Sequence, residues 1–547
     1  MKDLILKHAL VNAIEHDGKA EIQAVLKKLI AEDPSVRNKI KDVIKEISKV
    51  VNEVNKTSVE EQMRKLEALG VKIEKKSQEE KYELPELPGA KIGKVVTAFP
   101  PEPSKYLHLG ASKAALVNFT YAKKYKGKFI LRFEDSNPEL AKKEYYKIIM
   151  DGLKWLGIKW GKMDYLSDHI PEYYKTVEQI LSKNLAYVCT CRQEDIKRKR
   201  EAGEVCIHRM QSIEENLKMW NKMAKMKEGE AIVRLKIDMQ HPNSTMRDPA
   251  IIRIIDAPHP RTKNKFRLWP VYDFATSMLD IWEGVTHRVR SKEFELRKEL
   301  QQHIQKILGA KSPYIIEIGR FNIEGIPSSG RIIREMIETK QLSGWDDPRL
   351  TTIVALKRRG FVPKAITEFL ISTGVTKTEA VLTWEPLEAE NRKMIDLKAN
   401  RYFAVLNPEE ITIRNPPKIK FVDVPLHPGN KEKTRKISVT KNIFVEGNDF
   451  EKYQNNEVGL INLGTVVLKK DAKYISSEIK FESQKIQWVP QKNTKIKIVM
   501  PDGSTKEGIA ENNVKKLKVN QLIQLVRIGF CRVDKVDKDI VLYYSHK

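Results

Sequence analysis

The spacing of apolar residues predicts helices at the start of the chain. Between residues 22 and 30 apolar residues recur at intervals of three and four, which places them on one face of a helix, and Pro34 ends this pattern. The same spacing resumes between residues 40 and 54. We therefore expect a small helical domain within residues 1–90. Two uses are equally open for it: docking a partner protein, or forming a passive helical layer.

The pattern changes after a linker-like Leu-Pro-Glu-Leu-Pro-Gly run at residues 84–89. Short β-rich runs at 94–99 and 128–133 alternate with helical patterns at about 108–124 and 139–156. The order strand, helix, strand, helix predicts a parallel sheet with crossover helices, which is a Rossmann-type arrangement.

Two further regions follow, one helical and one rich in strands. Residues 311–400 look mostly helical. From about residue 402, apolar and polar residues alternate in short runs that Pro, Gly and Asn separate. Asp502-Gly503 is a good hairpin turn. The alternation predicts β-barrels, so we expect a multidomain α/β + α + β protein.

Composition narrows the class of protein. The chain has 547 residues, of which 41% are hydrophobic, and this is enough for several domains with their own cores. No uncharged apolar run of about 18 residues could span a membrane, and the first seven residues lack the apolar core of a secretory signal. Four cysteines are too few for a disulfide framework, so we expect an intracellular protein.

The charge of the chain is strongly positive but unevenly placed. The formal net charge is +26, yet residues 1–90 hold 17 basic and 17 acidic residues. Residues 401–547 hold 27 basic and 17 acidic residues, so the excess begins only after the first 90 positions. A polyanionic partner such as a nucleic acid is therefore expected along the rest of the chain.

The loop between the first predicted strand and helix is a candidate phosphate site. In parallel sheets ligands bind where strands end, and a helix N-terminus there offers free N–H groups to phosphates. His108 can donate a hydrogen bond to a phosphate or ribose oxygen, and Gly110 lets a flat base approach the backbone. The plain alternative is a proline-stiffened loop with a capping histidine.

Several motifs, in order along the chain, resemble those of one family. The loop reads Phe-Pro-Pro-Glu-Pro-Ser-Lys-Tyr-Leu-His-Leu-Gly at 99–110, similar to the HIGH signature of class I aminoacyl-tRNA synthetases of the glutamyl and glutaminyl subgroup. Further matches are Arg-Phe-Glu-Asp-Ser-Asn-Pro-Glu at 132–139, Gly-Trp-Asp-Asp-Pro-Arg at 344–349 and Gln-Leu-Val-Arg-Ile-Gly-Phe at 524–530. The last run and the neutral helical N-terminus resemble the archaeal type of glutamyl-tRNA synthetase.

The resemblance implies a function for each part of the chain. Residues 91–310 would be the catalytic domain, with an insertion at about 186–268 that binds the tRNA acceptor end. Residues 311–400 would contact the tRNA stem, and residues 401–547 would bind the anticodon. The implied substrates are ATP with Mg²⁺, L-glutamate and tRNA(Glu), joined through glutamyl-adenylate in the cytoplasm. Whether tRNA(Gln) is also charged stays open, as do two alternatives: a glutaminyl enzyme, or a weakened paralogue that only binds tRNA.

The resemblance also assigns site residues. It implies catalytic roles for His108, Gly110 and Arg331, and it gives the amino-acid pocket to Glu134, Tyr272 and Arg290. An arginine suits a carboxylate because its planar fork can bind both oxygens. The residues expected around ATP come from two loops; they are Pro101, Glu102, Pro103, His108, Leu109, Gly110, Ser328 and Ser329.

Three positions depart from the family's pattern. Ala98 stands where the family usually has an arginine that helps to hold the amino acid, and Ala111 replaces the second histidine of the signature. Gly330 stands where the lysine of the mobile second loop is expected, and Arg331 is one residue later. These departures raise the question of what holds the substrates here.

A cysteine cluster and two basic runs lie outside these motifs. The pattern Cys189-x-Cys191 and Cys206-x-His208 offers four zinc ligands. Its C-x-C spacing is unusual, so a structural zinc site and buried thiols beside a histidine are equally open. The basic runs at 197–200 and 357–359 are either solvated faces or contacts to tRNA phosphates.

Overall fold

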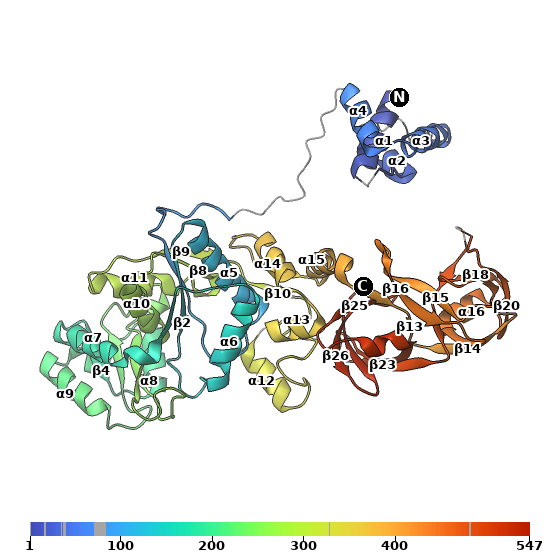
Figure 1. The fold of residues 1–547 in the computed structure, drawn as a ribbon. Helices are drawn as coiled ribbons and strands as arrows, with labels where there is room; N and C mark the ends of the chain where they lie inside the picture. Colours follow the sequence, from blue (N-terminus) through green and yellow to red (C-terminus); the bar gives the residue numbers. More distant parts are fainter. Residues whose placement is uncertain are drawn as a thin grey trace. The chain divides into compact units, whose positions relative to one another are not determined.

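The protein consists of two compact units, residues 1–83 and 84–547 (Figure 1). The computed structural model describes residues 2–15, 18–33, 36, 40–69, 84–327, 329–480 and 483–547. No helix in these described ranges is long and apolar enough to cross a membrane.

The first unit is a small helical domain, as the apolar spacing predicted. Its buried face is almost wholly aliphatic. The side chain of Asn55 links the end of α3 to the segment before α2: it accepts the Ala20 N–H at 2.6 Å and donates to the Ala20 carbonyl oxygen at 3.0 Å. The buried Gln62 amide donates to the carbonyl oxygens of Gly18, Val54 and Thr57. The helices are α1 (Lys2–Glu15), α2 (Ile22–Glu32), α3 (Ile40–Val54) and α4 (Val59–Ala68).

The second unit begins with the predicted parallel sheet. Strands β1 (Val96–Phe99), β2 (Lys128–Phe133) and β3 (Lys162–Tyr165) are parallel neighbours. The connections are α5 (Leu109–Lys124) and α6 (Lys143–Trp155). The N–H of Thr286 donates to Val96 O at 2.9 Å, so the parallel pair β8 (His287–Ser291) and β9 (Tyr314–Ile318) extends the sheet past β1. The Rossmann-type prediction is confirmed.

An antiparallel sheet is inserted between these strands. Its strands are β4 (Ala186–Cys189), β5 (Ile232–Leu235), β6 (Ala250–Ile254) and β7 (Leu268–Pro270). The helices that accompany it and lead back to the parallel sheet are α7 (Ile170–Ser182), α8 (Gln193–Ala202), α9 (Ile213–Met223), α10 (Tyr272–Glu283) and α11 (Arg297–Ile307). Its strands share one large core with α7, α9, α10 and α11.

A mostly helical segment connects the catalytic sheet to the C-terminal strands. Its elements are β10 (Phe321–Ile323), α12 (Gly330–Glu338), α13 (Ile353–Arg359), α14 (Pro363–Ser372), β11 (Ala380–Leu382) and α15 (Glu385–Ile395). Arg358 donates to Asp346 at 2.7 Å and to Asp534 at 3.2 Å. Arg359 is 1% exposed and donates to Ser545 O at 2.9 Å. Two residues of the basic run at 357–359 therefore brace the C-terminal strands.

The C-terminal region is built from two seven-stranded sheets, drawn in orange and red in Figure 1. One is ordered β12-β25-β26-β27-β23-β24-β13 and the other β21-β18-β19-β20-β14-β17-β22, beside a β15-β16 hairpin. The predicted turn at Asp502-Gly503 joins β23 to β24, with Gly503 at a φ of 85°. The strands are β12 (Asn400–Tyr402), β13 (Ala404–Val405), β14 (Pro408–Arg414), β15 (Phe421–His427), β16 (Asn430–Ser438), β17 (Asn442–Glu446), β18 (Glu457–Leu460), β19 (Gly464–Val467), β20 (Asp471–Ser476), β21 (Lys485–Ile486), β22 (Trp488–Pro490), β23 (Asn493–Val499), β24 (Thr505–Glu511), β25 (Leu522–Leu525), β26 (Gly529–Val536) and β27 (Ile540–His546), with α16 (Gly447–Tyr453).

Candidate active site

The loop after β1 presents a neutral histidine at the start of α5. His108 is the N-cap of this helix, and its Nδ1 accepts the Ala111 N–H at 3.4 Å. Burial, with the nearby charges of Lys105 and Arg320, lowers the pKa of His108 to about 3. The imidazole is therefore neutral at physiological pH. Because Nδ1 is an acceptor, the proton is on Nε2, where it can be donated to a phosphate or ribose oxygen.

A small hollow lies next to His108. A Cβ at Gly110 would lie 3.3 Å from the His108 ring, so a side chain at this position would crowd the imidazole. The hollow brings the predicted ATP residues His108, Leu109 and Gly110 together with residues much later in the chain. Those later residues are Phe321, Asn322, Ile323, Ile326 and Thr351.

The other predicted ATP residues of this loop have structural contacts as well. Pro103 is buried, and its carbonyl oxygen accepts the Lys142 N–H at 3.0 Å. Pro101 accepts the backbone N–H of Glu134 at 3.1 Å. Glu102 is exposed and accepts the Ser104 hydroxyl at 2.9 Å. The loop is thus fixed by its own backbone before any ligand arrives.

The Trp-Asp-Asp-Pro-Arg run holds this loop from the other side. Trp345 stacks on Tyr106, with ring centroids 5.1 Å apart and planes 6° from parallel. Asp347 is 2% exposed and accepts the Ser343 N–H at 2.9 Å and Arg349 Nε at 2.8 Å. Burial alone would raise the pKa of Asp347, but these hydrogen bonds lower it to about 2. The motif therefore positions the loop.

The second loop precedes α12. Ser329 is the N-cap of this helix, and Arg331 lies exposed in its first turn. Arg334 donates to Ser104 O at 2.8 Å, which ties the helix to the first loop. Ser328 lies outside the described residues.

Glu134 follows β2, Arg290 lies on β8, and the charges of both act on Tyr272, the first residue of α10. Arg290 is 5% exposed and donates to Gln301 Oε1 at 2.7 Å and to Phe294 O at 3.1 Å. Its Nε is buried without a partner in the described chain. Burial raises the pKa of Tyr272, with the charge of Glu134 adding to this effect and Arg288 and Arg290 opposing it. The hydrogen-bond partners of Arg290 are neutral, and its ion pair with Glu317 is long, at 4.0 Å. Because Glu317 also pairs with Lys377 at 2.7 Å, the charge of Arg290 is only partly compensated.

A buried ion network that the sequence did not reveal includes Glu134 and connects β2, α10 and β8. Arg132 is fully buried and contacts three carboxylates: Glu134 at 3.0 Å, Asp280 at 2.9 Å and Glu283 at 2.8 Å. Arg288 shares Asp280 at 3.1 Å. Acidic residues on the otherwise apolar α10 were the available signal.

Ala98 provides no cation to this pocket. It is fully buried and packs against Ile130 and Val285. Because β1 lies between β2 and β8, the two strands that flank it carry the pocket arginines Arg132 and Arg288. The arginine expected at position 98 is thus absent from a pocket that already contains buried guanidinium groups.

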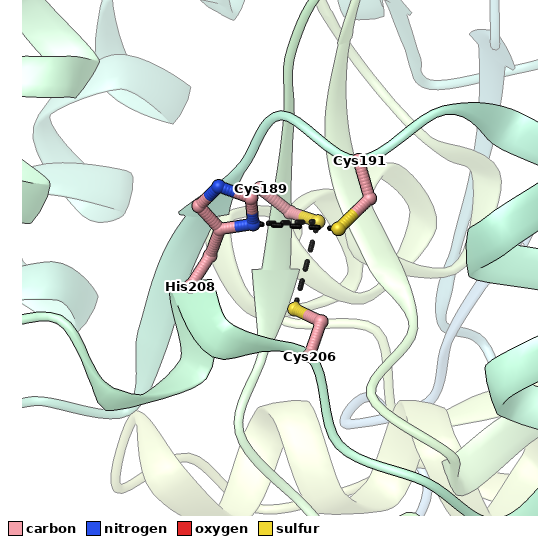
Figure 2. Close-up of side chains that lie close together, drawn as sticks. All are labelled: Cys189, Cys191, Cys206 and His208. Atoms are coloured by element: carbon pink, nitrogen blue, oxygen red, sulfur yellow. Dashed lines mark hydrogen bonds between the residues drawn. The ribbon is translucent and has the colours of Figure 1, made fainter.

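The cysteine cluster has the geometry of a metal site (Figure 2). The ligand atoms of Cys189, Cys191, Cys206 and His208 all lie within 4.8 Å of one another. A tetrahedral zinc with bonds of about 2.3 Å would place two sulfurs about 3.8 Å apart, and Cys189 Sγ and Cys206 Sγ are 3.8 Å apart. Cys191 Sγ lies 3.4 Å from His208 Nδ1. The second ring nitrogen contacts Thr190 Oγ1 at 2.9 Å, which orients the imidazole.

The basic run on α8 is only partly available to a ligand. Arg200 donates to the carbonyl oxygens of Arg247 and Ser244 at 3.0 and 2.7 Å, so it anchors α8 to the insertion. Lys197 and Arg198 are exposed, and Arg198 pairs with Asp195 at 3.0 Å.

The parallel sheet with a histidine at a helix N-terminus is followed along the chain by two mixed seven-stranded sheets, and comparison with known families identifies the class of protein. Residues 94–397 match the family "tRNA synthetases class I (E and Q), catalytic domain". Residues 399–484 and 485–534 match two anti-codon binding domains of the same class. The chain therefore belongs to the class I tRNA synthetases of the E and Q group.

Archaeal relatives identify the branch of this family. A protein named glutamate–tRNA ligase from Pyrococcus furiosus is 39% identical, with 100% of both chains covered. The Pyrococcus horikoshii protein of the same name is 40% identical over 100% of both chains, and that of Nitrosopumilus maritimus is 40% identical over 100% of this chain and 99% of the other. The likeness to the archaeal glutamate enzymes thus extends over the whole chain.

Proposed function

We propose that this protein attaches L-glutamate to tRNA(Glu) through glutamyl-adenylate. An oxygen of the glutamate α-carboxylate bonds to the α-phosphorus of ATP, and pyrophosphate leaves. The hydroxyl at the tRNA 3′ end then takes the acyl group, and AMP leaves. In the first step the neutral His108 donates to ATP, the α5 N-terminus and Arg331 bind phosphate oxygens, and Glu134 holds the substrate ammonium.

The observation that carries the choice of glutamate is Arg290. It is a buried cation whose hydrogen-bond partners are neutral and whose nearest carboxylate, Glu317, lies 4.0 Å away and also pairs with Lys377. A carboxylate ligand would complete the compensation of its charge, whereas an amide would not. Tyr272 lies within reach of its charge on one side of the same pocket.

ATP–pyrophosphate exchange tests this assignment, with glutamate and glutamine compared in the presence of tRNA. We expect exchange with glutamate to exceed that with glutamine by at least a hundredfold. Preference for glutamine would identify the glutaminyl alternative. The absence of exchange with either, in a protein that still binds tRNA, would identify the weakened paralogue that Ala98 and Gly330 bring into question. Charging of purified tRNA(Gln) by the same preparation tests that second substrate.

We also propose that the C-terminal sheets bind the anticodon and the insertion the acceptor end. The net +10 of residues 401–547 and the exposed Lys197 and Arg198 support this division. The proposed domains are residues 1–90, 91–310 with the insertion at 186–268, 311–400 and 401–547. Because residues 1–90 are neutral, deleting residues 1–80 should leave the salt dependence of tRNA binding unchanged. A flatter slope after that deletion would contradict the assignment.

A structural zinc ion is the proposed occupant of the cysteine cluster. The donor set and the 3.8 Å sulfur separation support it. The ion would fasten η3 (Ile207–Met210) to the end of β4, and with them the insertion. Metal analysis should return one zinc per chain, lost in Cys206→Ser and kept in Cys531→Ser. A full zinc content in Cys206→Ser would contradict this site.

The helical first unit is the proposed docking site for a protein partner in the cytoplasm. The even balance of 17 basic and 17 acidic residues in 1–90 makes a nucleic acid an unsuitable ligand for it. Co-purification with the whole chain and not with the chain that lacks residues 1–80 tests this proposal. Identical sets of co-purifying proteins would favour the passive helical layer.

A further inference from the structure

Lys105 lies directly over the glycine that begins α12. A Cβ built on Gly330 would be 2.9 Å from Lys105 Cδ and 3.4 Å from Lys105 Cβ. The shorter distance is below an ordinary Cβ contact, so a side chain at position 330 would have to displace the flexible stem of Lys105, which occupies this space. The hydrogen bond from Arg334 to Ser104 O, at 2.8 Å, holds the same two segments together.

The charge of Lys105 is available to a ligand. In the part of the chain that the structure describes, its ammonium group has no ion pair, hydrogen bond or ring contact. The side chain is half-buried, and its charge reaches His108, where it contributes to the lowered pKa of the imidazole. The cation therefore lies between two helix N-termini, those of α5 and α12, whose free N–H groups also favour anions.

Lys105 is better placed than Arg331 to stabilise the charge of ATP phosphates bound next to His108. Arg331 is exposed on α12, and among the residues that the structure describes no contact ties it to the first loop. Lys105 belongs to that loop, which the Trp345–Tyr106 stack and the backbone pairing of Leu109 with Thr351 keep in place. A cation on a fixed element loses less freedom when the transition state forms.

We propose that Lys105, packed across Gly330, supplies the ammonium group that stabilises the ATP phosphates, in place of a lysine from the second loop. The proposal rests on the function proposed above. As the amino-acid carboxylate oxygen bonds to the α-phosphorus, the bond from that phosphorus to the bridging oxygen breaks, and pyrophosphate leaves with the electron pair. Lys105 keeps its protons throughout and contributes only charge to the oxygens on which charge builds up.

The first test is Lys105→Met in glutamate-dependent ATP–pyrophosphate exchange. Methionine keeps the unbranched stem that covers Gly330 but removes the charge. We expect the rate constant to fall a hundredfold or more while the KM for ATP changes less than fivefold, because the interaction strengthens in the transition state. Lys154→Met, an exposed lysine on α6, is the matched control and should stay within twofold of the wild type. A Lys105→Met enzyme within threefold of the wild type overturns the proposal.

The second test moves the lysine back to the second loop. Gly330→Lys alone should lower activity, because its Cβ would collide with Lys105. The double variant Lys105→Gly and Gly330→Lys should recover at least a tenth of the wild-type rate. A Gly330→Lys single variant as active as the double variant would show that the two residues do not share one place.

The two proposals can fail separately. A wild-type protein that shows no exchange with glutamate contradicts the proposed function. In that case the affinity of the wild type and of Lys105→Met for Mg-pyrophosphate, whose charge resembles that of the leaving group, is measured by calorimetry and decides the role of Lys105: weaker binding in the variant supports it, and equal binding overturns it.

Discussion

On the amino-acid side of the active site the charged groups are buried and already paired, whereas on the phosphate side they are accessible and wait for a ligand. Arg132 and Arg288 are 0% and 2% exposed and share Asp280. Lys105 and Arg331 have no partner in the described chain. The pocket must distinguish a carboxylate from an amide, so its geometry is fixed in advance. ATP brings several negative charges of its own, so the phosphate side needs only cations within reach.

The largest expected effect is a loss of folding stability when a buried, paired charge on the amino-acid side is removed. Arg132→Met should lower the free energy of unfolding by about 3–5 kcal/mol, because it leaves buried carboxylates without their cation. Denaturant unfolding followed by tryptophan fluorescence measures this change. Arg198→Met, in the exposed pair with Asp195, is the control and should cost less than about 1 kcal/mol. Equal losses would remove the contrast between the two sides.

The second prediction tests selectivity in the pocket. Arg290→Gln should raise the KM for glutamate about thirtyfold, since a charged hydrogen bond contributes about 2 kcal/mol. The KM for ATP should stay the same, because Arg290 lies on the amino-acid side. Steady-state exchange kinetics measure both constants, and Arg253→Gln on the exposed side of β6 is the control. An equal rise in both KM values would mean that the substitution disturbs the whole site.

The third prediction concerns pH. The pKa of His108 is about 3 in the folded protein against an ordinary 6.5, so between these values only the unfolded chain binds the proton. Acidification therefore destabilises the folded protein progressively below pH 6.5. His108→Asn removes this contribution and should lose about 2 kcal/mol less stability than the wild type between pH 7 and pH 5. Unfolding at both pH values measures it, with His427→Asn as control; parallel curves for His108→Asn and the wild type would contradict a neutral His108.

The smallest effect is expected at Arg331. Because this residue is exposed and unpaired, Arg331→Ala should change the free energy of unfolding by less than about 0.5 kcal/mol. If Lys105 is the principal phosphate cation, the exchange rate should also fall less than tenfold. A hundredfold loss in Arg331→Ala, with Lys105→Met unaffected, would return this role to the second loop.

Much of the fold followed from the order of residues. Strands β1 and β2 and helices α2, α3 and α5 lie where alternation and helical spacing put them, because local periodicity sets which face of an element can be buried. The position of His108 at a junction between a strand and a helix was also predictable from the sequence, because the apolar runs on both sides are short and clearly bounded. The buried ion network could not be predicted from the sequence, because Asp280 and Arg288 are far from Arg132 along the chain.

The sequence alone determined the sheet, the loop with His108, the order of the parts and the family whose motifs it resembles. Only the tertiary structure decided which charged groups lie close to one another and which are buried. The stem of Lys105 fills the space above Gly330, and Asp280 joins two arginines from strands on either side of Ala98. The physical reason is that the strength of an electrostatic interaction depends on the distance between the charges and on their burial. Neither quantity can be read from the residues that are neighbours along the chain.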